Sequence, residues 1–408
     1  MVGDLKFGIL WKLVFCGFML SKFILEHESH RPKKHIVYGF LLNFKQFFTL
    51  SSLTSISPTL KKISTGVSFP LLLLYFSCFY SKKKSLLLMK TIAVYVIVSS
   101  IPFLLGVVEP IARGYDLSTY GLDSYGFIGV FQRAHTASMV LAPSIIIVLY
   151  TLKHADSNLH KILYFSLILI GFYALIQTFV RTGLVMVLFG AFILYFQKIK
   201  SMRMLKRILF AGILLSTMFI YYQSNEVAQM RVQGRNIYNQ DRVIEFDNIG
   251  SGRLRIASYA LNNWVEEGFS SICFGLGEEL ALEKMERTKG TRVFAHNGVV
   301  EILQTNGIFG FSLLCLFLFS MHQYVKRNKN SKYYILYQSL FFSYLIGFIL
   351  QGTDNFVLYF YIALIVTITC RDKSKVRKTG EEKQNIKNHE LFIPKNSKQI
   401  PISSNFKD

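Results

Sequence analysis

Long apolar runs, separated by short polar segments, recur along most of this chain, and this pattern constrains its fold more than any other feature. Each run holds roughly 18 to 25 residues, the length that a helix needs to cross the hydrocarbon core of a bilayer. A chain with many such runs buries them in lipid and in helix–helix contacts, so a soluble globular fold is excluded. The sequence therefore predicts an all-α membrane bundle of about 10–12 transmembrane helices.

The first run, residues 5–25, carries three lysines and lacks a small-residue cleavage site, so we expect a retained helix instead of a removable signal. The other helices are expected to follow the hydropathy of the chain. The predicted spans are residues 5–25, 36–57, 63–80, 86–108, 136–152, 161–179, 182–197, 207–222, 302–324, 333–351 and 355–370.

The formal net charge of +22 would suggest nucleic acid in a soluble protein, so its location decides its meaning. The basic residues lie in short segments between apolar runs, which is the positive-inside pattern that orients membrane helices. No nucleic-acid partner is implied. The five cysteines are scattered, and their spacing provides no metal site. The basic segments are 31–34, 82–84, 198–207, 326–332 and the tail after Cys370.

Counting spans back from a cytoplasmic tail places residues 223–295 on the outer face. The expected organisation is an N-terminal bundle (1–222), this extracytoplasmic loop (223–295), C-terminal transmembrane helices (296–370) and a disordered basic tail (371–408). The loop holds nine basic and ten acidic residues, so it is nearly neutral.

Helical spacing of apolar residues from Ile256 to Val265 predicts an amphipathic helix within this loop, with Ser251 as its N-cap and Gly268 as its end. We expect the helix to lie on the membrane surface with Trp264 in the interface. The glycine-rich run 275–277 predicts a turn.

Two arginines are candidates for binding an anionic substrate. Arg181, in "TFVRTGLVMVLFG", stands between two apolar runs with almost no loop around it. Arg253 begins the amphipathic helix, whose free N–H groups attract anions and beside which a guanidinium can bind a diphosphate through two bonds. The alternatives are a snorkelling residue at a helix end for Arg181 and an ordinary solvated side chain for Arg253.

A third polar group lies in "AHNGVVEILQTNGIFGF", where His296 and Asn297 precede a span whose first turns carry Glu301, Gln304 and Asn306. Polar side chains in a span are costly when they face lipid, so we expect them to face a cavity or the bundle interior. Histidine accepts a proton near neutral pH, which suits a general base acting on a sugar hydroxyl. The alternative is that His296 and Asn297 only cap the helix.

The order of these motifs resembles the bacterial O-antigen polymerase and O-antigen ligase family over residues 132–311. The matching features are an Arg-Thr-Gly at a helix start, a long loop with Gly-Arg before a Trp-bearing helix, a Gly-x-Gly turn, and His-Asn-Gly-x-x-Glu with a later Asn-Gly. The segment "FQRAHTASM" departs from the family's pattern, and the chain has one span fewer than many members.

The resemblance implies a multi-pass protein of the bacterial inner (plasma) membrane with an active site on its extracytoplasmic face. It implies an inverting, metal-independent glycosyl transfer without a cofactor. Arg181 and Arg253 would hold the undecaprenyl diphosphate of a lipid-linked glycan, His296 would be catalytic, and Asn297, Glu301 and Gln304 would support it. Partners would be lipid-linked glycans, the bilayer, and assembly proteins such as a flippase and a chain-length regulator.

We expect polymerisation of lipid-linked repeat units, and two alternative functions remain open. A ligase would use the same donor but transfer the finished chain to a lipid core acceptor. A flippase or other transporter would place charged groups midway along several helices, whereas the polar candidates here gather at helix ends and in one loop. Glu245 and Asp247 are a poor match for the acidic pair of a nucleotide-sugar enzyme, so a lipid-linked donor fits better.

Overall fold

The computed structural model describes residues 33–49, 56–110, 126–131, 133–196, 253–290, 292–352 and 356–370, with single positions between 14 and 21 and at 223 and 229. Within these ranges the regular elements are helices and no strand occurs, which confirms the predicted all-α class. Most of the predicted span 5–25, all of the span 207–222, the tail 371–408, Ser251 and the acidic pair lie outside the described residues.

Five described helices are long and apolar enough to cross a membrane, and they agree with predicted spans. Three shorter apolar segments, in α3, α8 and α16, match further predicted spans. The chain is therefore a multi-pass membrane protein. The long helices are α4 (Lys82–Val98) continuing into α5 (Ile101–Leu104), α6 (Ala134–Lys153), α7 (Asn158–Gln177), α14 (Gly298–Lys326) and α15 (Tyr334–Gln351). The shorter apolar segments are Gly66–Phe79 within α3 (Ile56–Phe79), α8 (Arg181–Phe196), and Val357–Cys370 within α16 (Phe356–Cys370).

The predicted span 36–57 is wrong in its length. Helix α2 covers Lys34–Phe44 and is followed by a 3₁₀ helix, η1, over Lys45–Phe48, while α3 already begins at Ile56 instead of 63. An α-helix of 11 residues is about 16 Å long, roughly half of the hydrocarbon core. Hydropathy alone misses this end, because Lys45 finds its partners in distant helices, as shown below.

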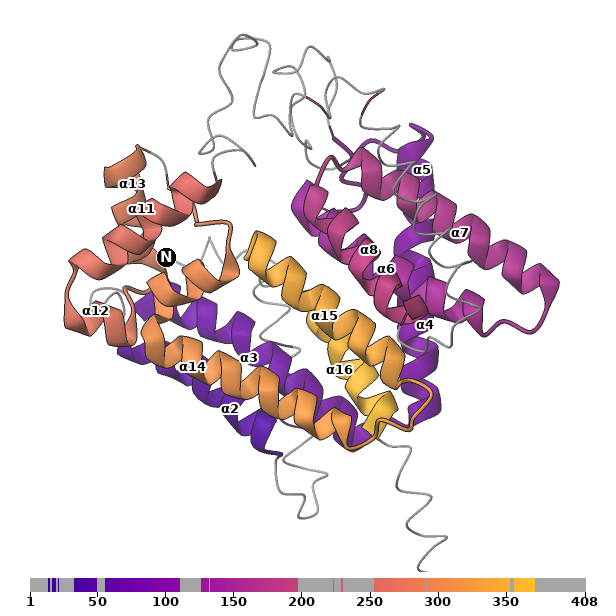
Figure 1. The fold of residues 1–408 in the computed structure, drawn as a ribbon, viewed down its shortest axis with the longest axis horizontal. Helices are drawn as coiled ribbons and strands as arrows, with labels where there is room; N and C mark the ends of the chain where they lie inside the picture. The colour runs from indigo at the N-terminus through magenta and orange to yellow at the C-terminus, as the bar shows by residue number, and fades with distance from the viewer. Residues whose placement is uncertain are drawn as a thin grey trace, which may run out of the picture.

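Helices α2, α3 and α14 lie on one side of the bundle, α4, α6, α7 and α8 on the other, and α15 and α16 between them (Figure 1). Helix α6 is buried along most of its length because α4, α7, α8, α15 and α16 surround it. Small residues bring α8 and α15 close together. Ser339 Oγ donates to Gly190 O at 2.6 Å and Ser343 Oγ donates to Met186 O at 2.9 Å, which is typical of packing between membrane helices.

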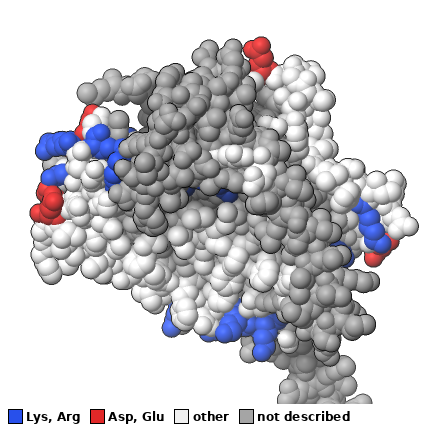
Figure 2. Space-filling view, turned by 45° about the horizontal axis from the view of Figure 1, so that its top comes forward, with Lys and Arg blue, Asp and Glu red and all other residues white. Residues whose placement is uncertain are grey.

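The basic turns of the bundle meet at one end of it. Lys82 and Lys332 each lie over the ring of Tyr333, 4.9 and 5.3 Å from its centroid, so the starts of α4 and α15 are neighbours. The ring of His35 lies 4.9 Å from that of Tyr324, which brings the start of α2 to the end of α14. We call this the basic end. Figure 2 likewise shows Lys and Arg side chains gathered along the lower edge of the described surface and mixed with acidic ones at its left.

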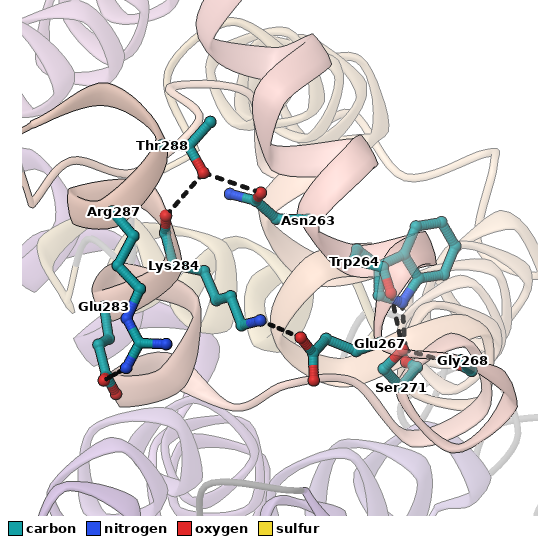
Figure 3. A network of polar contacts seen from close by, with 9 residues as sticks. All are labelled: Asn263, Trp264, Glu267, Gly268, Ser271, Glu283, Lys284, Arg287 and Thr288. Atoms are coloured by element: carbon teal, nitrogen blue, oxygen red, sulfur yellow. Dashed lines mark hydrogen bonds and ion pairs between the residues drawn. The ribbon is translucent and has the colours of Figure 1, made fainter.

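At the left of Figure 1, α11 (Arg253–Glu266), α12 (Phe269–Phe274) and α13 (Glu278–Lys289) pack against one another and against α14. A polar network joins them (Figure 3): Lys284 forms an ion pair with Glu267, and Thr288 Oγ1 donates to Asn263 Oδ1 at 3.0 Å. The predicted helix of the loop and its end near Gly268 are both present, since Gly268 has φ 86° and directly precedes α12.

The placement of Trp264 in the membrane interface is wrong. Its side chain is only 8% exposed, and its indole Nε1 donates to Ser271 O at 2.8 Å, while Ser271 Oγ donates to Trp264 O at 2.6 Å (Figure 3). These bonds tie α11 to α12. The helical spacing located the apolar face of α11 correctly, but that face packs against α13 and α14 instead of lipid.

Candidate active site

A chain of hydrogen bonds joins the starts of α8 and α11 to the last turn of α15, at the end of the bundle opposite the basic end. The guanidinium of Arg253 donates through Nη1 to Leu350 O at 2.7 Å and through Nη2 to Gln351 Oε1 at 3.5 Å. Thr182 Oγ1 donates to the same Gln351 oxygen at 3.1 Å. The last turn of α15 is the negative end of its dipole, which attracts the guanidinium. Gln351 is therefore a shared partner of Arg253 and of Thr182, the residue after Arg181.

Two positive helix ends therefore lie side by side. Arg181 is the exposed first residue of α8, Arg253 is the first residue of α11, and neither helix has an acidic residue in its first turn. The N–H groups of a helix start carry partial positive charge, and each arginine adds a full positive charge beside them, so the positive potential is high where the two starts meet. A dianionic group such as a diphosphate is the kind of ligand that such a potential attracts.

The turn that carries Arg181 is as tight as the sequence predicted. Helix α7 ends at Gln177 and α8 begins at Arg181. Thr178 Oγ1 donates to Leu175 O at 2.7 Å and accepts from Val180 N–H at 3.2 Å, while Phe179 takes a left-handed φ of 54°. These bonds hold the turn, so the position of Arg181 is set by α7 and α8 and not by a flexible loop.

His296 has a strained backbone beside the start of α14. Its φ of 51° is unusual for a residue with a side chain and costs about 1–3 kcal/mol, which the surroundings must offset. Ala295 before it is fully buried, and the side chain of Asn297 after it accepts from the N–H groups of Val299 (3.0 Å) and Val300 (3.2 Å). The histidine is thus held between a buried residue and a helix cap.

The environment of His296 favours its neutral form. Burial lowers the pKa of the half-buried imidazole below its ordinary value of 6.5, and the positive charges of Arg253 and Lys289 lower it further. The ring of His135, at the start of α6, lies 6.3 Å from that of His296. A histidine that is neutral at pH 7 and close to an arginine can accept a proton from a substrate bound between them.

The supporting residues have different roles. Asn297 is the N-cap of α14, so the capping alternative holds for Asn297, whereas His296 lies outside the helix. Glu301 faces the end of α15, because a Cβ added to Gly352 would lie 2.7 Å from Glu301 Oε2. Gln304 is 1% exposed, and none of its side-chain polar atoms has a hydrogen-bond partner among the described residues.

Helix α14 breaks at Gly307, where φ is 64° and ψ is −174°. The segment after the break, residues 308–326, is about 28 Å long, which is close to the thickness of the hydrocarbon core, and the segment 298–306 before the break follows His296 and Asn297. The break leaves carbonyl groups without helical partners. The turn 275–277 bonds two of them: Leu276 N–H donates to Gln304 O at 2.8 Å and Gly277 N–H to Thr305 O at 3.0 Å.

Lys45 completes this junction. Its side chain is 3% exposed, and its ammonium donates to the carbonyl oxygens of Phe274, at the end of α12, and Asn306, at the break in α14. Both carbonyls lie at the negative ends of helical segments, which stabilise a cation. A single buried lysine from the N-terminal bundle therefore fixes residues 298–306 of α14, the half-helix that follows His296.

Sequence reasoning missed Lys45, Thr182, Gln351 and Gly352. Gln351 and Gly352 end a span, and Thr182 follows the arginine that the sequence pointed out. A polar residue at a helix end next to a candidate cation was the available signal. For Lys45 no local signal existed, because its partners lie 229 and 261 positions away in the chain.

Comparison with known proteins agrees with the resemblance predicted over residues 132–311. A family model described as O-Antigen ligase (Wzy_C) matches residues 165–315, a range that includes Arg181, Arg253 and His296. A search of curated proteins gave no match. Members of this family transfer lipid-linked glycans in polysaccharide assembly, as ligases or polymerases. The chain is thus a multi-pass membrane protein that carries an O-antigen ligase family domain over residues 165–315.

Proposed function

We propose that this protein polymerises undecaprenyl-diphosphate-linked oligosaccharide repeat units into a surface polysaccharide on the extracytoplasmic face of the bacterial plasma membrane. The observation that carries the proposal is the pair of helix starts bearing Arg181 and Arg253, joined through Gln351 beside a histidine whose pKa is lowered. This combination offers an anion site and a proton acceptor at one membrane surface.

In the proposed reaction, Arg181 and Arg253 bind the diphosphate of the donor and offset the charge that develops as it leaves. The oxygen of the acceptor hydroxyl forms a bond to sugar C1 on the face opposite the diphosphate. The bond from C1 to the diphosphate oxygen breaks, its electron pair leaves with undecaprenyl diphosphate, and the hydroxyl proton passes to His296. The configuration at C1 inverts, and the two guanidinium groups provide the charge stabilisation without a bound metal.

Transfer of a finished chain to a lipid core acceptor is the second candidate, and the description of the matching family model as O-Antigen ligase favours it. Both reactions use the same donor site. Deleting the gene and separating surface polysaccharide on a gel distinguishes them. Loss of the ladder with one repeat unit still attached supports the polymerase, whereas lipid-linked chains that accumulate without surface attachment support the ligase.

His296→Asn tests the catalytic role. Asparagine can still hydrogen-bond but does not act as a base, and loss of a general base costs roughly 10²–10⁴ in rate with the fold intact. We expect normal expression and membrane insertion without polymer. The matched control is His160→Asn, because His160 is an exposed histidine at the start of α7. A wild-type ladder from His296→Asn at wild-type protein level would make the histidine structural.

The proposed orientation predicts which exposed positions react with an impermeant thiol reagent in intact cells. Glu286 lies exposed on α13 and Asn330 lies exposed in the α14–α15 turn at the basic end. In a background without native cysteines, Glu286→Cys should react and Asn330→Cys should react only after the membrane is opened. The reverse labelling would invert the topology and move the site to the cytoplasmic face.

A further inference from the structure

A groove runs along the membrane-facing surface between α4 and α7, remote from the candidate active site. Its volume is about 450 Å³, and its floor is formed by α6. Most of its wall is apolar, and Leu87 and Tyr95 on α4 are each 66% exposed, so it opens sideways into the hydrocarbon region. The lining residues are Leu87, Lys90, Thr91, Val94, Tyr95, Val98, Ile147, Val148, Thr151 and Tyr164.

The length of the groove corresponds to one leaflet. Its α4 wall extends from Leu87 to Val98, which is about 16 Å of helix, and half of the hydrocarbon core is about 15 Å. Neighbouring α7 side chains are exposed and apolar as well, including Leu163 and Leu169. The groove is therefore continuous with the lipid-facing belt and has the dimensions of a single acyl chain.

A positive cluster stands at the end of the groove nearest the basic end. Lys90 lines the groove, and Lys332 is close enough for its charge to act on Lys90. Neither forms an ion pair within the described part of the chain. Side chains on a helix lean toward its N-terminus, so Lys90 points from the apolar wall toward the start of α4.

The start of α4 adds to this positive charge. Lys82, Lys83 and Lys84 form its first turn, which has no acidic residue, and Ser81 is its N-cap. Cations at a helix N-terminus oppose the helix dipole, and a bound anion relieves this. Lys82 and Lys332 lie over the same Tyr333 ring, so the helix start and the lysine pair form one cationic surface.

We propose that this groove is a binding site for an anionic phospholipid of the leaflet at the basic end, with one acyl chain in the groove and the headgroup phosphate held by Lys90, Lys332 and the start of α4. The apolar wall and the cationic surface meet at the depth where an acyl chain joins its headgroup. The site lies on the opposite side of the membrane from the candidate active site and does not depend on the proposed reaction.

Native mass spectrometry of the purified full chain tests this site with phosphatidylglycerol and phosphatidylcholine of equal chain length. Phosphatidylglycerol should remain bound more strongly. Each lysine near the membrane surface contributes about a fivefold gain for an anionic lipid, so Lys90→Met and Lys332→Met should each weaken retention about fivefold. Val94→Trp fills the groove without changing charge and should also displace the lipid.

Lys34→Met is the matched control, since Lys34 is an exposed lysine at the basic end on α2, outside the groove. Equal loss from Lys34→Met and Lys90→Met would show only general attraction to a basic surface and would overturn the proposal. Unchanged retention in Val94→Trp, equal binding of phosphatidylcholine, or a dimer that Val94→Trp dissociates would also overturn it. Size-exclusion profiles identify any variant that misfolds. The lysine variants and Val94→Trp change different parts of the site, so misfolding of one still leaves the other to test the proposal.

Discussion

The Lys45→Met substitution would remove the ammonium that bonds the carbonyl oxygens of Phe274 and Asn306. A buried acceptor left without its donor costs about 1–3 kcal/mol, so loss of both hydrogen bonds would destabilise the junction by about 2–6 kcal/mol. Methionine recovers part of this because no cation is buried. We expect a net local loss of about 2 kcal/mol, which is roughly a 30-fold change in the opening equilibrium.

Hydrogen–deuterium exchange of the amides of Leu276 and Gly277 measures this opening directly, because both amides donate across the junction to α14. In Lys45→Met these two amides should exchange roughly 30-fold faster. Lys34→Met, which removes an exposed lysine from the preceding helix α2, should leave them unchanged. Wild-type exchange in Lys45→Met, or an equal increase in Lys34→Met, would refute the assignment of Lys45 as the residue that holds the half-helix.

Two further predictions concern the turn and the histidine. Gly275→Ala should destabilise the protein by about 1–3 kcal/mol more than Gly268→Ala. Both positions have positive φ, but an added Cβ lies 2.4 Å from Asn306 N at Gly275 and meets nothing at Gly268; equal shifts in thermal unfolding would contradict this. Lys289→Met removes a charge that lowers the pKa of His296, so that pKa should rise and the acid limb of the pH–rate profile should move to higher pH. An acid limb that does not move would show that His296 is not the proton acceptor.

The sequence by itself determined the class of fold, because spans of 18 or more apolar residues have few alternatives to membrane helices. It also pointed to Arg181 and Arg253, which begin α8 and α11, and to His296, which precedes the N-cap of α14; their role in catalysis stays a prediction. Tertiary structure decided what these residues contact. Gln351 joins two helix starts, and its role depends on where α15 ends against α8 and α11.

Packing also decided the two predictions that were wrong. Trp264 has the amphipathic character of an interface residue, but α12 covers it and supplies Ser271 as its partner. Lys45 interrupts a span that hydropathy extends to residue 57, and the cost of burying its ammonium is offset by hydrogen bonds to carbonyls more than 200 positions away. Hydropathy and helical spacing report the preference of each residue for water or lipid, whereas a buried polar group is stabilised by whichever partner the fold brings to it, and only the tertiary structure identifies that partner.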